Sequence, residues 1–200
     1  MVRFFFMKNQ LAEIVFATNN LHKLEEARAL AAGKMKILSL SDINCHDDIP
    51  ETAATLEGNA LIKARWVKEK YGYDCFADDT GLMVDALDGA PGVYSARFAG
   101  PQCNANDNMA LLLEKLQGKS DRKARFVTVI ALVKDGEEHL FTGKVEGTIA
   151  TEPHGTEGFG YDPVFIAEES GLPFAEMSQQ DKNAISHRGR AMRQLIDFLK

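Results

Sequence analysis

The feature that most limits the possible folds is a long apolar strand followed by a hairpin turn. Residues Ala124–Val133 are mostly β-branched or aliphatic, and Asp135-Gly136 follows two positions later. Asp-Gly between two strands is typical of two-residue hairpin turns, in which both turn residues take positive φ. Val145–Ala150 extends the returning strand. Any fold for this chain must therefore contain an antiparallel pair in its second half.

The first half follows a different pattern, in which strands alternate with helices. The short apolar run Ile14–Ala17 precedes Leu21–Ala32, whose leucines and alanines recur at helical spacing. A second strand, Ile37–Leu40, and a helix over Leu56–Tyr71 repeat this order. Strand–helix–strand units favour parallel pairing, whereas the hairpin is antiparallel. The sequence therefore predicts an α/β fold with a mixed central sheet flanked by helices.

The remaining pattern predicts a third helix over Met109–Leu116, a short strand at Pro163–Ile166 and a closing helix over His187–Leu199. No repeat and no long linker separates these elements. We therefore expect one domain over residues 1–200, with residues 1–13 peripheral to it.

Composition excludes several classes of protein. The chain has 23 Lys and Arg against 29 Asp and Glu, and this net charge of −6 argues against general nucleic-acid binding, which depends on neutralising many phosphates. Its three cysteines form no C-x-x-C pair, which argues against a disulfide framework or a zinc site. The apolar run after Arg3 is shorter than the roughly 7–15 residues of a secretory signal, and no segment approaches the ~20 residues of a membrane span. We expect a cytoplasmic protein that binds neither nucleic acid nor membrane.

The turn between the first strand and the first helix is a candidate anion site. Thr18 and Asn20 lie where backbone N–H groups and the positive end of the helix dipole point outward. Lys23, one turn into the helix, could reach back toward a bound anion. The alternative is that Thr18 or Asn20 only caps the helix and Lys23 lies in solvent.

Two adjacent carboxylates form the sharpest feature. Asp78 and Asp79 directly follow the apolar run Cys75–Ala77, where we expect a strand to end. Buried carboxylates need a counter-charge, and a bound Mg2+ would supply one. If the strand continues instead, the two side chains lie on opposite faces, and one of them has a role other than metal binding. A solvated turn is the alternative. Asp-Thr-Gly also marks aspartic proteases, but those need two such loops and this chain has one.

Two further groups of residues could contact a ligand. Asn59 and Lys63 share one face of the second helix, although a lysine beside an apolar stripe often keeps its charge in water. Phe159 lies on a glycine-flanked loop and could stack on a flat ring, with Lys182 and His187 later in the chain. A lone histidine is more often structural, but these residues together favour a nucleotide as the ligand.

Six segments, in order along nearly the whole chain, resemble the inosine triphosphate pyrophosphatase family. They are TNNLHK (residues 18–23), ET (51–52) with EGNALIKAR (57–65), ADDTGL (77–82), GAPGVYSAR (89–97), GFGYDP (158–163) and KNAISHRG (182–189). The resemblance implies an elongated two-lobed fold with a cleft between the lobes, a homodimer, and Mg2+-dependent activity on ITP, dITP and XTP.

The resemblance also implies a role for individual residues. Asp79 would bind Mg2+ and act as the general base, and Glu51 would be the second acidic metal ligand. Thr80, where many relatives have serine, keeps the hydroxyl and would contact the substrate. The phosphates would be held by Thr18, Asn19, Asn20, Leu21, His22, Lys23 and Lys63. The nucleoside would be bound by Phe159, Gly160, Tyr161, Asp162, Lys182, His187 and Arg188.

The reaction expected from this resemblance is hydrolysis of the α–β phosphoanhydride to a nucleoside monophosphate and pyrophosphate. Hypoxanthine and xanthine carry a 6-oxo acceptor where adenine carries an amino donor, so N–H groups near His187 and Arg188 could distinguish them. Two other hypotheses stay open. One is a hydrolase of modified pyrimidine or methylated nucleotides, like the related septum-inhibitor group, and the other is a catalytically silent nucleotide sensor.

Overall fold

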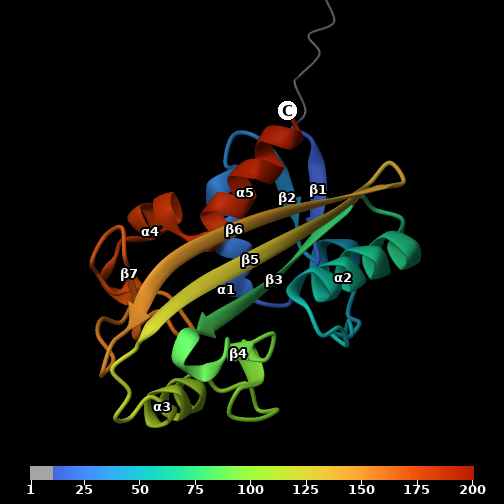
Figure 1. Ribbon diagram of the computed structural model, residues 1–200. Coiled ribbons are helices and arrows are strands. Elements are labelled where there is room, and N and C mark those ends of the chain that lie inside the picture. Colours follow the sequence, from blue (N-terminus) through green and yellow to red (C-terminus); the bar gives the residue numbers. More distant parts are fainter. Residues whose placement is uncertain (1–10) are drawn as a thin grey trace, which may run out of the picture.

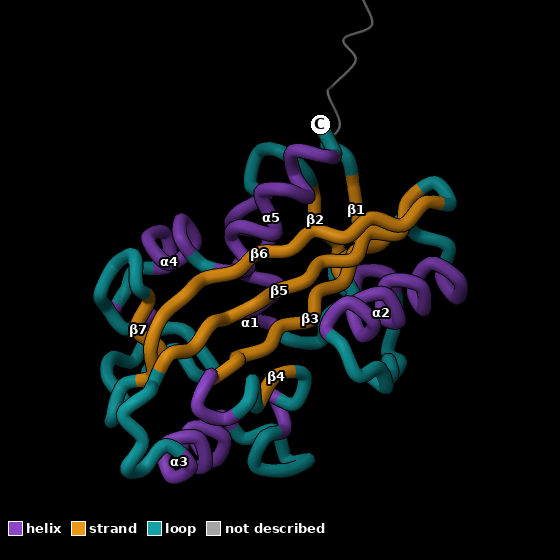
Figure 2. Tube along the Cα trace, viewed as in Figure 1, coloured by secondary structure: helices purple, strands orange, loops and turns teal. Residues whose placement is uncertain are grey.

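The computed structural model describes residues 11–200, which form one mixed seven-stranded sheet with helices packed against it (Figures 1 and 2). The strands are β1 (Glu13–Phe16), β2 (Lys36–Leu38), β3 (Cys75–Val84), β4 (Pro91–Gly92), β5 (Lys123–Lys134), β6 (Glu137–Ile149) and β7 (Phe165–Ala167). The helices are α1 (Leu21–Ala31), α2 (Leu56–Tyr71), α3 (Ala105–Lys115), α4 (Gln179–Ile185) and α5 (His187–Phe198). The expectation for residues 1–13 falls mostly on residues 1–10, which lie outside the described part.

The sheet has the order β2-β1-β3-β5-β6-β7, with β4 paired to β3. β1 is parallel to β2 and β3, and the remaining pairs are antiparallel. Asp135 and Gly136 have φ of 52° and 84°, as the predicted hairpin turn requires. The prediction of a mixed sheet with flanking helices is confirmed.

One lobe surrounds the β1 end of the sheet. Helices α1 and α5 cover one face, and α2 covers the other (Figure 1). Alternation along β3 supplies both cores, since Phe76 packs toward α1 and α5 while Cys75 and Ala77 pack toward α2. This alternation sets the direction of every later side chain on β3.

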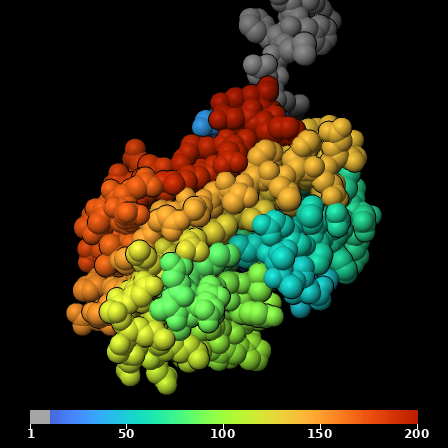
Figure 3. All heavy atoms as spheres, in the orientation of Figure 1, coloured from blue at the N-terminus to red at the C-terminus, as the bar shows by residue number. Residues whose placement is uncertain are grey.

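The second lobe lies at the other end of the long strands β3, β5 and β6. Its core joins α3 and β7 to the strand ends, through Leu82, Leu112, Phe126 and Phe165 among others. In the space-filling view, the cyan region of α2 and the green region before α3 project separately from the sheet, with a hollow between them (Figure 3). The predicted two-lobed shape with a cleft is therefore confirmed.

The expected end of a strand at Asp78 is wrong. β3 continues through the acidic pair to Val84 because β5 pairs with it along its whole length. β1, in contrast, pairs with β3 only at Cys75 and Phe76. Where β1 stops, the edge of β3 from Ala77 to Gly81 pairs with no other described strand on that side. The two carboxylates therefore lie in mid-strand beside an open edge.

Smaller differences concern where elements begin and end. Residues Asp85–Leu87 form a 3-10 turn after β3. α3 begins four residues earlier than predicted because the Asn104 side chain accepts hydrogen bonds from the N–H groups of Asn106 and Asp107. Among residues 11–200, every helix is too short or too polar to cross a bilayer.

Candidate active site

Asp78 and Asp79 point to opposite faces of β3 and have different partners. Asp78 accepts from Lys23 Nζ at 2.9 Å and from Arg188 Nε at 3.1 Å, on the face covered by α1 and α5. Asp79 accepts from Asn59 Nδ2 at 3.0 Å on the α2 face, and its nearest recorded cation is Lys63 at 3.9 Å. Adjacent residues of one type therefore have different electrostatic surroundings.

The pKa values of the two carboxylates express this difference. Burial alone would raise the pKa of Asp78, but the Lys23 and Arg188 charges hold it well below its usual range. Burial raises the pKa of Asp79 above its ordinary value, and the Lys63 and Lys23 charges offset this only in part. Asp78 is thus a neutralised structural anion, whereas Asp79 lacks a close positive partner.

Asp78 belongs to a chain of six alternating charges, five of them buried and Lys23 half-buried, that we call the buried ion chain. Its members, in order, are Lys23, Asp78, Arg188, Glu26, Lys182 and Asp162. Lys182 Nζ lies 2.8 Å from Glu26 and 2.7 Å from Asp162. The buried ion chain links α1, β3, α4, α5 and the loop after residue 157. It therefore connects residues predicted to hold the phosphates with residues predicted to hold the nucleoside.

Lys63 lies on the α2 side of β3, beside Asp79. Its ammonium donates to Glu51 Oε1 at 2.5 Å, and its side chain is buried rather than directed into solvent. Asn59, one turn earlier, donates to Asp79 and accepts from the N–H of Ala53. Lys63, Asp79 and Glu51 therefore meet where the loop before α2 reaches the edge of the sheet.

The turn before α1 caps the helix. Asn20 Oδ1 accepts from the N–H of Lys23 at 3.1 Å, and Thr18 Oγ1 accepts from the N–H of Asn20. Asn19 and Leu21 are exposed. Asn20 thus caps the helix, Thr18 closes the turn before it, and Lys23 turns inward to Asp78. Phosphate binding by this turn stays a prediction.

A cavity of about 400 Å³ lies between the lobes on the α1 and α5 side. It brings together most of the residues that the sequence predicted from its two ends. The predicted site residues that line the cavity are Asn20, His22, Lys23, Thr80, Phe159, Gly160, Tyr161, Asp162, Lys182, His187 and Arg188. The second lobe adds Ser95, Ala96, Cys103, Ala105 and Asn108, and β5 adds Phe126. The predicted residues Asp79, Glu51 and Lys63 are not among its lining residues, since Asp79 lies on the α2 face of β3 whereas its neighbour Thr80 lines the cavity from the other face.

The loop that carries Phe159 is held by its own acid. Asp162 accepts from the N–H of Phe159 at 2.8 Å, and Gly158, at φ 77°, leaves no room for a Cβ beside that carboxylate. The Phe159 ring stacks on His22, with centroids 5.2 Å apart. Tyr161 donates to the carbonyl of Ser95, so its hydroxyl ties the loop to the second lobe. His22 therefore lies against Phe159, at the end expected to hold the base.

His187 is a buried histidine at the start of α5. Its ring stacks on Phe126, and among the described residues its Nδ1 has no hydrogen-bond partner. Burial, with the Arg188 and Lys182 charges, lowers the pKa of His187 well below the ordinary value, so the ring is neutral. Because His187 lines the cavity, its unpaired Nδ1 is suited to form a hydrogen bond with a ligand atom.

The neutral His187 predicts that stability falls on mild acidification. Below pH about 6.5 the unfolded histidine binds a proton that the native ring does not, so stability falls by up to about 1.4 kcal/mol per pH unit. Urea midpoints measured from pH 7 to 5 should show a smaller decline in His187→Gln than in wild type. His154→Gln, at an exposed position, should keep the wild-type decline. An equal decline in both variants would contradict this account.

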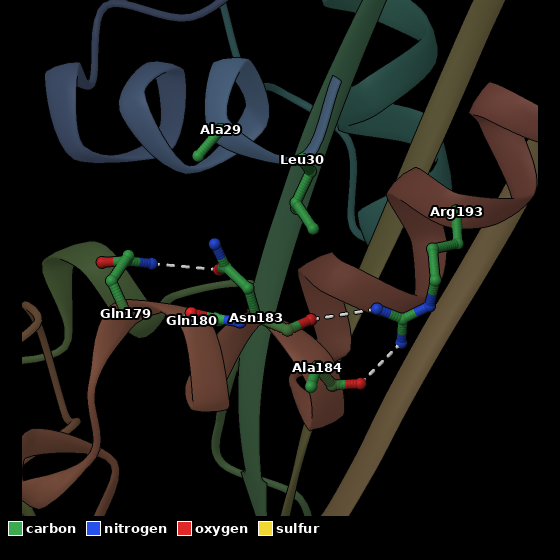
Figure 4. A pocket seen from close by; sticks show the side chains of 7 residues that line it. All are labelled: Ala29, Leu30, Gln179, Gln180, Asn183, Ala184 and Arg193. Carbon is green, nitrogen blue, oxygen red and sulfur yellow. Dashed lines mark hydrogen bonds between the residues drawn. The ribbon is translucent and has the colours of Figure 1, made fainter. Parts of the chain in front are cut away.

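A second cavity, lined by residues of α1, α4 and α5, lies outside this site (Figure 4). Arg193 donates to the carbonyls of Asn183 and Ala184, which end α4, and so fastens α4 to α5. Gln179 donates to Asn183 Oδ1 at 3.0 Å and to Glu26 at 3.4 Å. These contacts support the backbone from which Lys182 projects.

Comparison with known proteins shows the family of this chain. Residues 14–198 match the Ham1 family. The chain belongs to the Ham1 family. A Porphyromonas gingivalis relative named dITP/XTP pyrophosphatase is 57% identical over 190 residues, covering 94% of this chain and 98% of that protein. A Flavobacterium psychrophilum relative of the same name is 55% identical over 188 residues, covering 94% and 99%. The solved structure of a HAM1 protein from Coxiella burnetii has a TM-score of 0.86 at 40% identity, covering 94% and 98%.

Sequence reasoning gave no specific role to three residues of this candidate site. Glu26 pairs with both Lys182 and Arg188. An acidic residue beside the apolar stripe of α1 was the feature of the sequence that could have indicated it. Asn59 was noticed at the spacing of Lys63 but assigned no role. The Thr128 hydroxyl lies 2.7 Å from that of Thr80, which β5 places opposite. The last contact had no sequence signal, because it depends on strand register.

Within residues 11–200, no three His, Cys, Asp or Glu side chains converge as a ready-made metal site. Asp79 and Glu51 are two carboxylates that both approach Lys63. Magnesium is often held by one or two protein carboxylates, with water and substrate phosphates completing its shell. The donor set and the uncompensated burial of Asp79 therefore fit Mg2+ in this Ham1 family chain.

Proposed function

We propose that this chain hydrolyses the non-standard purine nucleoside triphosphates dITP, XTP and ITP to the monophosphate and pyrophosphate, which removes them from the nucleotide pool. The names of its Ham1 relatives support this activity. The observation that carries the proposal is the 400 Å³ cavity, which runs from Phe159 and His187 to Lys23 and Thr80. Thr80, which lines the cavity, directly follows Asp79 in β3, and Asp79 is a buried carboxylate whose nearest recorded cation is 3.9 Å away. The chain therefore offers aromatic residues for a base, a lysine for phosphates and, next to Thr80, the proton acceptor Asp79.

Mg2+ is the cofactor in this proposal, and Asp79 and Glu51 are the residues that would hold it. When bound, the ion neutralises charge that builds on the phosphate oxygens. Lys63, which donates to Glu51 and lies 3.9 Å from Asp79, adds a fixed positive charge at the same place. The acidic net charge of the chain does not oppose this, because local cations decide phosphate binding.

Asp79 is the proposed general base. Asn59 donates to its Oδ2 and the N–H of Thr80 donates to its Oδ1, each at 3.0 Å, so the carboxylate is held in one orientation. A pKa raised by burial makes it a better acceptor for the proton of an attacking water. That water attacks the α-phosphorus, and pyrophosphate leaves.

His187 and Arg188 are the proposed readers of the base. A neutral imidazole offers one N–H donor, which suits a 6-oxo group and would remain unpaired against the amino group of adenine. Rejecting ATP by ~10⁴ requires about 5.5 kcal/mol, and one unpaired buried group supplies about 1–3 kcal/mol. At least two mismatched contacts are therefore needed, and Arg188 supplies further N–H groups.

The test is pyrophosphate release from ITP by the purified protein, with Mg2+ and then with a chelator. We expect release with Mg2+, its loss with the chelator, and a kcat/KM for ITP well above that for ATP. Release from modified pyrimidine nucleotides alone would favour the septum-inhibitor alternative, and binding without release would favour a sensor. The homodimer and the cytoplasmic location stay predictions from the sequence.

A further inference from the structure

The cations that line the cavity are already neutralised by acids of this chain. Lys23, Lys182 and Arg188 alternate with three carboxylates in the buried ion chain, so its formal charges cancel. A triphosphate adds several negative charges to this region. Breaking buried pairs to bind it would be costly, so cations outside the buried ion chain are needed.

Glu51 lies between two cations that are outside the buried ion chain. Lys63 of the first lobe donates to its Oε1, and Arg97 Nη1 lies 3.7 Å from its Oε2. Arg97 ends a 3-10 turn, Ser95–Arg97, that packs against α3 in the second lobe. One carboxylate therefore faces cations from both lobes, which is the arrangement that an anion in the cleft would require.

Arg97 is positioned but only weakly paired. Its guanidinium packs over the Tyr94 ring at 5.2 Å, and a separation of 3.7 Å from Glu51 is beyond hydrogen-bond distance. Ser95 and Ala96, the residues before it, line the nucleoside cavity. Arg97 thus directly follows two residues of the cavity wall and faces Glu51. A planar guanidinium matches phosphate oxygens as well as carboxylate oxygens.

We infer that Arg97 binds the pyrophosphate portion of the substrate from the second lobe, opposite Lys63. This role rests on the proposed function, which makes a triphosphate the ligand. The Glu51 carboxylate lies between the two cations. The contribution of Arg97 to affinity should then depend on the number of phosphates in the ligand, because Arg97 lies outside the nucleoside cavity.

Calorimetric binding of inorganic pyrophosphate and of IMP, both with Mg2+ present, tests this role. We expect Arg97→Ala to weaken pyrophosphate binding about 10- to 100-fold, as for a lost hydrogen bond to a charged group. IMP affinity should change less than about twofold, since IMP lacks the two terminal phosphates. Arg97→Lys should recover part of the loss, because it keeps the charge without the planar fork.

The matched control is Arg125→Ala. Arg125 also pairs with acids, Asp85 and Glu146, and its side chain is 32% exposed against 31% for Arg97. Its partners are Asp85 and Glu146 and not Glu51, so pyrophosphate binding should be unchanged. Unchanged pyrophosphate affinity in Arg97→Ala, an equal loss of IMP affinity, or no pyrophosphate binding by the wild type would overturn the inference. A wild type that binds pyrophosphate but does not release it from ITP would instead contradict the proposed function.

Discussion

Asp79→Asn is expected to lower kcat for ITP hydrolysis by about 10²- to 10⁴-fold, the range for loss of a general base, with little change in stability. The amide has nearly the shape of the carboxylate but accepts no proton and binds Mg2+ less well. Because burial raises the pKa of Asp79, replacing the charge removes an unfavourable buried anion. Steady-state pyrophosphate release and a thermal melt measure the two effects.

Asp74→Asn is the control for this variant. Asp74 lies just before β3 and pairs with Lys68 and Lys134, away from the cavity. Its turnover should stay close to that of the wild type. Turnover of Asp79→Asn within about tenfold of the wild type would remove Asp79 from the catalytic role.

Asp78→Asn is expected to show the opposite result, a large loss of stability. Lys23 and Arg188 would keep their charges in a buried site that has lost its shared anion. Removing one partner of a buried ion pair typically costs about 3–5 kcal/mol, which corresponds to a melting temperature lower by roughly 10 °C in a chain of this size. Chemical denaturation and thermal melts of the two variants, compared side by side, measure the difference.

The comparison is informative because both substitutions are the same change on adjacent residues. A fall in stability confined to Asp78→Asn, with a fall in kcat in Asp79→Asn, would match the two environments. Equal melting temperatures for the two variants would show that the buried ion chain does not stabilise the fold as described.

Local sequence patterns predicted several elements because they depend on neighbouring residues. The helix over Leu56–Tyr71 has its predicted bounds, since Thr55 caps its start and Gly72 takes the left-handed conformation at its end. The Asp135-Gly136 turn is equally local. These signals are complete within a few residues, so no tertiary information was needed.

The length of β3 could not be predicted in this way. Two adjacent carboxylates normally argue against a strand interior, and here pairing with β5 outweighs that local preference. The cost of burying Asp78 is offset by Lys23, 55 residues earlier, and by Arg188, 110 residues later. No pattern near Asp78 contains that information.

The sequence by itself determined the secondary structure pattern and the mixed sheet, because spacing and residue chemistry are local properties. The resemblance of its motifs to a known family named most of the residues that gather at the cavity. Only the tertiary structure decided which of the two aspartates is neutralised, that Glu26 connects Lys182 to Arg188, and that Arg97 faces Lys63 across Glu51. The physical reason is that electrostatic environment depends on distance in space, and packing brings together charges that lie far apart in the chain.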